Sequence, residues 1–326
     1  MLFRSLVRYA DLRPCTTAFV DARTPGSDRK ENFTIIGPGV AENPEQHVHI
    51  TVPHGFNIGA ARQPPRCVNS QHSHDTAEVF IVHTGRWRFT TGHDARDGSV
   101  EMGPGDTISI PIHTFRGFEN IGEDLGFMFA VLGGDDPGRV TWAPQVFEMA
   151  SRHGLVLLAN GSLVDTTRQA LPADARRMRP TTAADVARFD RYTSAELERC
   201  VVRAAALATT AAHEIAAGVR EVPIIGAASP AEHLAAGALN WPHGFSVRAL
   251  LLEPGALTPR CSRAEEEVLL MHSGALSIDW DDQTLALAAG DTLTVSIGLA
   301  HAIGNPGSER AVAYVVRRGD RPEPAR

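Results

Sequence analysis

The sequence is poor in cysteine and lacks long apolar runs. Its 326 residues include four cysteines, which stand far apart and form no CxxC pair. This argues against a disulfide scaffold and a structural zinc knuckle, and favours reduced thiols. No apolar run approaches the roughly 18 residues of a membrane span, and the first 15 residues lack the apolar core of a secretory signal. We therefore expect a cytoplasmic protein without a membrane segment.

The sequence also lacks a run or stripe of basic residues. Lysine and arginine number 31 against 38 acidic residues, and the net charge of −7 is spread along the chain. Nucleic acid is therefore not an expected partner. The content of 43% hydrophobic and 21% charged residues is ordinary for a globular protein. The length alone favours two domains of roughly 150 residues, each able to bury its own core.

An internal repeat organises the chain. The tetrapeptide Pro-His-Gly-Phe occurs at residues 53–56 and again at 242–245, and the same offset aligns FIVHTGRWRF with LLMHSGALSI. After a shortening of four residues in the second copy, Gly-Asp-Thr at 105–107 aligns with Gly-Asp-Thr at 290–292. Agreement of this extent predicts that the same structural unit occurs twice in the chain.

Each copy has the pattern of short strands. Segments such as VEMGPGDTISIPI alternate apolar and polar residues between Gly, Pro and Asp, which is typical of a small antiparallel barrel or sandwich. Residues 180–217 are instead rich in alanine with helical spacing, and Thr193 followed by Glu196 is typical of a capped helix start. We expect an all-β fold with barrels at 1–150 and 221–326, joined by a helical connector over 151–220. The alternative is that this helix packs on a barrel flank or on a dimer partner.

The sharpest chemical feature is the segment HSHDTAE at residues 72–78. Alternate residues of a strand project to one face, so His72 and His74 can point together into a barrel. Glu78 can complete a face of two imidazoles and one carboxylate, which suits Fe(II), Mn(II) or Ni(II) and leaves positions for substrate and oxygen. The alternative interpretation is three polar residues on a solvated strand face.

Two segments carry a resemblance to a known family. HSHDTAEVFIVHTG resembles the first cupin motif, G-x5-H-x-H-x3,4-E-x6-G, without its leading glycine, and GDTISIPIHTFRGFEN resembles the second, G-x5-P-x-G-x2-H-x3-N. The resemblance implies two tandem cupin barrels, each a double-stranded β-helix of jelly-roll type. It also implies that the metal ligands of the first barrel are His72, His74 and Glu78.

The family's fourth ligand, a histidine, falls on Arg116, which favours a three-ligand site. Arg116 is then either a surface salt-bridge partner or a clamp for a substrate carboxylate or enolate. His113 stands at the glycine position of the second motif, near the barrel mouth by resemblance. It is a candidate substitute ligand, or an acid or base.

The second copy departs from the motifs in the opposite way. It keeps His301 and Glu267 but has Cys261 and Arg263 where the first motif has histidines. A zinc site of Cys261, Glu267 and His301 is one hypothesis, against which Arg263 would place a fixed positive charge beside the metal. The other hypotheses are a structural barrel and a barrel that binds an organic ligand.

Three functions remain open. The leading hypothesis is a non-haem Fe(II) dioxygenase of a small aromatic or enolisable acid, because two-barrel cupins similar to this chain include dioxygenases that cleave hydroxylated aromatic acids. Arg116 would orient the acid group and His113 would move protons. The second is a redox-neutral isomerase, lyase or decarboxylase in which one divalent ion, Fe(II), Mn(II), Ni(II) or Zn(II), is a Lewis acid. The third is a non-catalytic binding protein. The resemblance also implies a homodimer.

Overall fold

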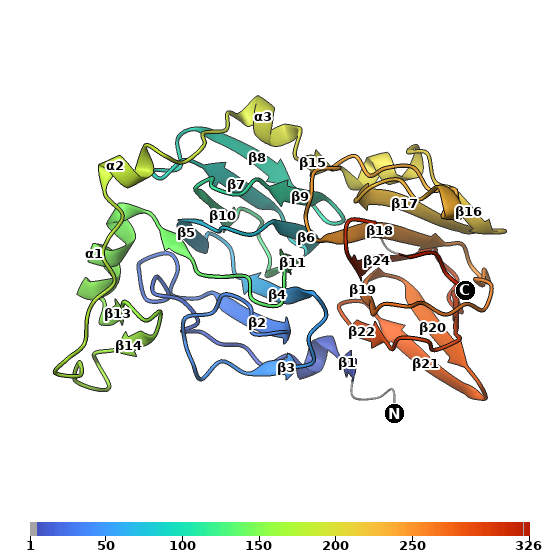
Figure 1. Cartoon of the computed structure of the whole chain (residues 1–326), viewed down its shortest axis with the longest axis horizontal. Coiled ribbons are helices and arrows are strands. Elements are labelled where there is room, and N and C mark those ends of the chain that lie inside the picture. Colours follow the sequence, from blue (N-terminus) through green and yellow to red (C-terminus); the bar gives the residue numbers. More distant parts are fainter. Residues whose placement is uncertain (1–4, 322) are drawn as a thin grey trace. The chain divides into compact units, whose positions relative to one another are not determined.

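The chain forms two compact units in a computed structural model that describes residues 5–321 and 323–326 (Figure 1). We call the first unit, Arg13–Thr51 with Asn57–Val201, the N-terminal barrel. The second unit contains the residues up to Leu12, Val52–Phe56 and Val202–Arg326, and we call it the C-terminal barrel. Residues 5–12 therefore belong to the same barrel as residues 202–321.

The larger sheet of the N-terminal barrel has the strand order β15-β9-β6-β11-β4-β2-β3 (Figure 1). In that order the strands span Val201–Val202, Thr107–Ile110, Glu78–Thr84, Gly126–Gly133, Phe56–Gln63, Glu31–Ile36 and Val48–Ile50. The smaller sheet has the order β12-β5-β10-β7-β8. Its strands span Thr141–Trp142, Val68–Ser73, Arg116–Asn120, Trp87–Thr91 and Gly98–Met102. Strands β13 (Leu155–Leu157) and β14 (Leu163–Asp165) form a separate hairpin.

The larger sheet of the C-terminal barrel has the order β1-β22-β19-β24-β18-β17-β16. Its strands span Leu6–Val7, Thr292–Val295, Glu267–Ser273, Ala311–Arg318, Phe245–Leu252, Val219–Ile225 and His213–Ala216. The smaller sheet has the order β21-β20-β23. Its strands span Gln283–Ala288, Ala275–Trp280 and Ala302–Gly304.

Side-chain patterning explains why these segments form barrels. Every second residue of β20 is buried, whereas β11 and β18 are buried at all eight positions. A strand with one buried face alternates, and a strand covered on both faces is continuously apolar. Leu269, Leu293 and Val315 lie in the core of the C-terminal barrel, on three strands of its larger sheet. The predicted all-β fold of two barrels is confirmed.

The predicted helical connector contains short helices in place of one long helix. Thr193 caps α3 (Ser194–Glu198) through a capping box with Glu196, as the sequence predicts, and Thr182 caps α2 (Ala183–Val186) in the same way. The alanine-rich run forms only the 3-10 helix η3 (Ala204–Ala208). It ends where the β-branched Thr209 and Thr210 turn their hydroxyls back to the carbonyl of Ala206.

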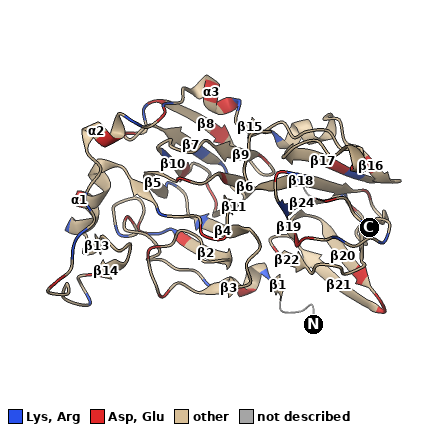
Figure 2. Cartoon of the chain, viewed as in Figure 1, with Lys and Arg blue, Asp and Glu red and all other residues tan. Residues whose placement is uncertain are grey.

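The other helical elements are also short. They are α1 (Pro144–Arg152), η2 (Tyr9–Asp11) and η4 (Pro230–Glu232). Within the described residues, no helix combines the length and the apolar character that a membrane crossing requires. Basic and acidic residues are interspersed along each unit (Figure 2).

Candidate metal centre

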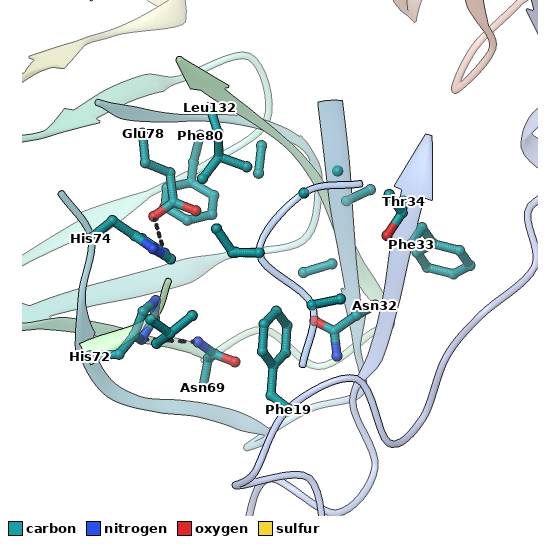
Figure 3. Close-up of a pocket in the computed structure, with 18 of the residues that line it drawn as sticks. Phe19, Asn32, Phe33, Thr34, Asn69, His72, His74, Glu78, Phe80 and Leu132 are labelled. Carbon is teal, nitrogen blue, oxygen red and sulfur yellow. Dashed lines mark hydrogen bonds and ion pairs between the residues drawn. The ribbon is translucent and has the colours of Figure 1, made fainter. Parts of the chain in front are cut away.

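The HxH segment and Glu78 meet at the end of one strand and the start of another. His72 is the fifth residue of β5, His74 follows the strand directly, and Glu78 opens β6. One potential ligand atom from each side chain lies within 4.8 Å of the other two, and all three residues are buried. Figure 3 shows the three side chains converging on the cavity. The predicted convergence is therefore present, and the solvated strand face is not.

Hydrogen bonds orient the His72 ring. Its Nδ1 lies 2.7 Å from the carbonyl oxygen of Ser70 and 3.4 Å from the side-chain nitrogen of Asn69. The shorter contact requires a proton on Nδ1, so Nε2 carries the lone pair that a metal ion needs. Nδ1 of His74 has no hydrogen-bond partner among the described residues. The two rings lie with their centroids 5.1 Å apart.

Burial controls the charge of the three candidate ligands. It lowers the pKa of His72 and of His74 well below the usual imidazole range, and the positive charge of Arg116 acts in the same direction. Both imidazoles are therefore neutral at neutral pH, which is the form that binds metals. Burial also raises the pKa of Glu78, while the neighbouring Arg116 opposes this rise.

Arg116 holds Glu78 and does not face the cavity. It lies on β10 opposite His72, is 1% exposed, and donates from Nη2 to the Glu78 carboxylate. Its Nη1 donates to the carbonyl oxygen of His72 at 3.4 Å, and its Nε has no partner among the described residues. The interpretation of Arg116 as a partner in a surface salt bridge is therefore wrong, because its ion pair with Glu78 is buried. The role of Arg116 as a clamp for a substrate stays a prediction, and Arg116 is not among the residues that line the cavity.

The cavity beside the cluster is small and mainly apolar. Its volume of about 70 Å³ leaves room for roughly five water molecules at 10–15 Å³ each. Aromatic and aliphatic side chains from several strands and loops line it, among them Phe19, Phe80, Phe118, Leu132 and Trp142. The polar lining residues apart from the cluster are Asn32, Thr34, Gln46 and Asn69. Glu78 is thus the one acid in the described lining.

His113 lies outside this cavity. Its Nδ1 is 3.8 Å from Asp75 Oδ1, and the two side chains are 54% and 71% exposed. Its backbone has a φ of +55°, a conformation that favours glycine, which explains why the motif has glycine at this position. The backbone nitrogen of His113 donates to the carbonyl oxygen of His74 at 3.4 Å, but its side chain is not part of the ligand group. The proposed roles of His113 as ligand or proton carrier stay predictions.

The residues present fit one divalent ion. Two neutral imidazoles and a carboxylate form the donor set that suits non-haem iron and related metals. The unpartnered Nδ1 of His74 and the oriented ring of His72 add to the fit. The fixed charge of Arg116 weakens attraction for the cation and strengthens attraction for an anionic substrate.

The corresponding place in the C-terminal barrel holds an ionic network. Arg317 Nε donates to Glu267 Oε2 at 2.6 Å, Arg263 Nε lies 3.1 Å from the same oxygen, and His301 Nε2 is 3.6 Å from Glu267 Oε1. Burial favours the neutral form of Glu267, but Arg317, His301 and Arg263 outweigh it and hold the pKa well below the usual range. No group of metal-ligating side chains is found here among the described residues.

Strand register identifies the residues that complete this network. Asn32 faces Ala61 across β2 and β4, as Glu221 faces Leu250 across β17 and β18. Leu132 pairs with Glu78 in the same way that Arg317 pairs with Glu267. Glu221 and Arg317 thus replace a neutral and an apolar residue of the first barrel.

Sequence reasoning missed Glu221, Arg248 and Arg317, which lie outside the two motifs. Extending the repeat offset beyond the motifs would have revealed Glu221 against Asn32, Arg248 against Gly59, and Arg317 against Leu132.

A buried carboxyl group supports the wall of the N-terminal cavity. Glu42 accepts hydrogen bonds from Trp142 Nε1 at 2.6 Å and from Val20 N at 2.7 Å, and the Trp142 ring lies 5.3 Å from that of His72. Burial raises the pKa of Glu42 from 4.5 to about 8 despite these bonds. Glu42 is therefore protonated in the folded protein at neutral pH.

This shift predicts a pH-dependent stability. Folding takes up a proton at Glu42 between pH 4.5 and about 8, so stability is highest below that window and falls by up to about 1.4 kcal/mol per pH unit across it. Thermal unfolding at several pH values within the window measures the slope. Glu42→Gln is expected to flatten it. An equal slope in both proteins would assign the effect to another group.

Comparison with known proteins places these observations in a family. The model of the cupin domain matches residues 61–132 and 250–317, one segment in each barrel. The oxalate decarboxylase of Lactobacillus farciminis, in a formate complex, is 13% identical with a TM-score of 0.55, over 98% of this chain and 86% of that one.

The oxalate decarboxylase of Bacillus subtilis at pH 4.6 is 14% identical with a TM-score of 0.56, over 98% and 77%. No curated protein matches the chain. These solved structures share the two-barrel fold, and the domain matches in both barrels identify the chain as a two-domain cupin.

Proposed function

We propose that the N-terminal barrel holds one divalent ion on His72, His74 and Glu78 and acts as a non-haem Fe(II) dioxygenase of a small aromatic or enolisable acid. The observation that carries this proposal is the buried three-donor cluster facing a small apolar cavity. Three protein ligands leave coordination positions for both a substrate and dioxygen, and iron(II) would supply the electrons that make the two react.

The composition of the cavity supports oxygenase chemistry over proton transfer. An isomerase or decarboxylase needs a protein acid or base near the reacting carbon. Beyond the cluster itself, the described lining offers only amides, a hydroxyl and apolar side chains. A dioxygenase draws its driving force from oxygen and can work with such a wall.

The chain's own residues have three tasks in this proposal. Arg116 acts as a positioning residue, because its buried hydrogen bond fixes the Glu78 carboxylate. Phe80, Phe118 and Trp142 exclude bulk water and strengthen electrostatic attraction in the cavity. The charge of Arg116, added to that of the ion, favours an anionic substrate, and the cavity volume of about 70 Å³ restricts that substrate to a small molecule.

Oxygen uptake tests the proposal. We expect protein loaded anaerobically with Fe(II) to consume oxygen in step with the loss of a small hydroxylated aromatic acid or enolisable acid, and the His74→Ala variant to consume none. Wild-type protein loaded with Zn(II) serves as the matched control, because zinc fills the site but has no redox chemistry. Turnover of the acid that proceeds equally without oxygen would contradict the dioxygenase.

A redox-neutral decarboxylase is the second candidate, because solved structures with this fold include oxalate decarboxylases. It predicts release of carbon dioxide without oxygen consumption. A protein that binds no metal and turns over none of the acids would instead be a binding protein. The homodimer expected from the family resemblance stays a prediction.

A further inference from the structure

The C-terminal barrel contains a second cavity that the metal chemistry does not use. Its volume is about 290 Å³, against about 70 Å³ for the cavity of the N-terminal barrel. Ile215, Leu250, Ile303 and Val315 form apolar parts of its wall. The charged residues around Glu267 also line it. A cavity of this size, apolar with a few convergent polar groups, is typical of a site for a small organic molecule.

The charges around Glu267 are balanced without a metal ion. Three arginines face three glutamates in one connected network, made of Arg248, Arg263, Arg317, Glu221, Glu232 and Glu267. Arg317 and Arg263 both contact the oxygen of Glu267 that would otherwise be free to bind a cation. Two guanidinium groups therefore supply the positive charge that a metal supplies in other cupin barrels.

The network retains hydrogen-bond donors for a ligand. Arg263 uses Nε for Glu267 and Nη1 for Glu232 and the carbonyl oxygen of Glu323, and its Nη2 takes part in none of these contacts. His301 donates from Nδ1 to the carbonyl oxygen of Leu299 and turns Nε2 toward Glu267 at 3.6 Å. Both side chains line the cavity. Because the three arginines and the three glutamates cancel in charge, the Nη2 group of Arg263 remains to bind an anion.

We propose that the C-terminal barrel is a metal-free binding site for a small organic carboxylate with an apolar body. Nη2 of Arg263 donates to the carboxylate, His301 lies beside it in the cavity wall, and the body lies against Leu250, Ile303 and Val315. A hydrogen bond from a guanidinium to a carboxylate is charge-assisted and therefore strong. The site is separate from the metal chemistry of the first barrel, so this proposal does not depend on the proposed dioxygenase activity.

Protection of Cys261 from alkylation tests the site in the unmodified full chain. Cys261 lines the cavity and is half-buried, whereas the half-buried Cys15 lies in the other unit. Metal-stripped protein is treated with a maleimide, and the labelling rate of each cysteine is followed by peptide mass spectrometry. Benzoate at ten times its dissociation constant leaves about one site in eleven free, so labelling of Cys261 should slow about tenfold. Labelling of Cys15 should not change.

Two further probes determine the chemistry of the ligand. Benzamide has the shape of benzoate without its charge, and benzylamine has the opposite charge; neither is expected to protect Cys261. Protection by benzylamine would mean that the glutamates of the network bind a cation, and would overturn the proposal. Absence of protection by about 20 mM benzoate, which would fill a millimolar site, would overturn it as well.

Calorimetric titration with benzoate adds a test by substitution. Arg263→Met is expected to weaken benzoate binding at least about tenfold, the effect of losing one charged hydrogen bond. Arg260→Met is the matched control, because Arg260 is exposed and donates to the carbonyl oxygen of Ala300, away from the network. Ala231→Trp fills the cavity from an exposed position without removing a charge, and should also weaken binding. Unchanged binding in both Arg263→Met and Ala231→Trp would contradict the assignment, and His74→Ala should bind benzoate as the wild type does.

Discussion

Replacing His74 with alanine is expected to weaken the binding of Fe(II) by at least about 100-fold, since even changes beyond the direct ligands of a metal cost 10–100-fold. The variant retains His72 and Glu78, and Glu78 is already engaged by Arg116. The remaining imidazole and the partly neutralised carboxylate are too few donors to displace the water molecules that hydrate Fe(II). The metal content of protein prepared anaerobically, followed by titration with Fe(II), measures the effect.

The matched control is His301→Ala in the other barrel. His301 stands at the ligand position of the second cupin motif, but its neighbours Arg263 and Arg317 leave no donor set for a metal. We expect one equivalent of metal in the wild type and in His301→Ala, and almost none in His74→Ala. A metal content that falls in His301→Ala and stays the same in His74→Ala would show that the site has been assigned to the wrong barrel.

Replacing Arg317 with methionine is expected to destabilise the C-terminal barrel by about 3–5 kcal/mol, the cost of leaving a buried charge without its partner. Arg317 is 5% exposed and donates to Glu267 at 2.6 Å and to Glu221 at 2.9 Å. Methionine retains the apolar stem but leaves both carboxylates short of a cation. The rate of amide hydrogen exchange in β18, β19 and β24 measures the loss of stability within that barrel.

Arg310→Met provides the comparison. Arg310 pairs with Glu253 at 2.6 Å, but the two side chains are 48% and 46% exposed. An exposed pair of this kind contributes at most about 1 kcal/mol. If both variants changed exchange equally, the buried network would be no more important than a surface ion pair. Exchange in the N-terminal barrel strand β6 should stay the same in both variants.

The sequence was sufficient to predict the barrels and the convergence of the three candidate ligands. The repeat required one fold to occur twice, and the spacing of His72, His74 and Glu78 is local, because a strand end and a short turn suffice to join them. The capping box at Thr193 is local as well. Such features depend on strand alternation and capping chemistry, which a single segment contains in full.

Other features depend on pairings between distant strands. Arg116 was placed at a ligand position, but its bond to Glu78 follows from the packing of β10 against β5 and β6. The network around Glu267 requires β17, β18 and β24 to come together, and no motif marks those residues. The alanine-rich connector illustrates the opposite error, because local helix propensity alone does not sustain a helix without an apolar face to bury.

Strand β1 has a consequence for how the protein is made. Leu6 and Val7 pair with Leu293 and Thr292, so two segments separated by almost the whole chain form one ladder. On the ribosome β1 is synthesised long before its partner strand β22. The C-terminal barrel can therefore close only after Thr292–Val295 have been synthesised, and until then the edge of β1 has no partner strand.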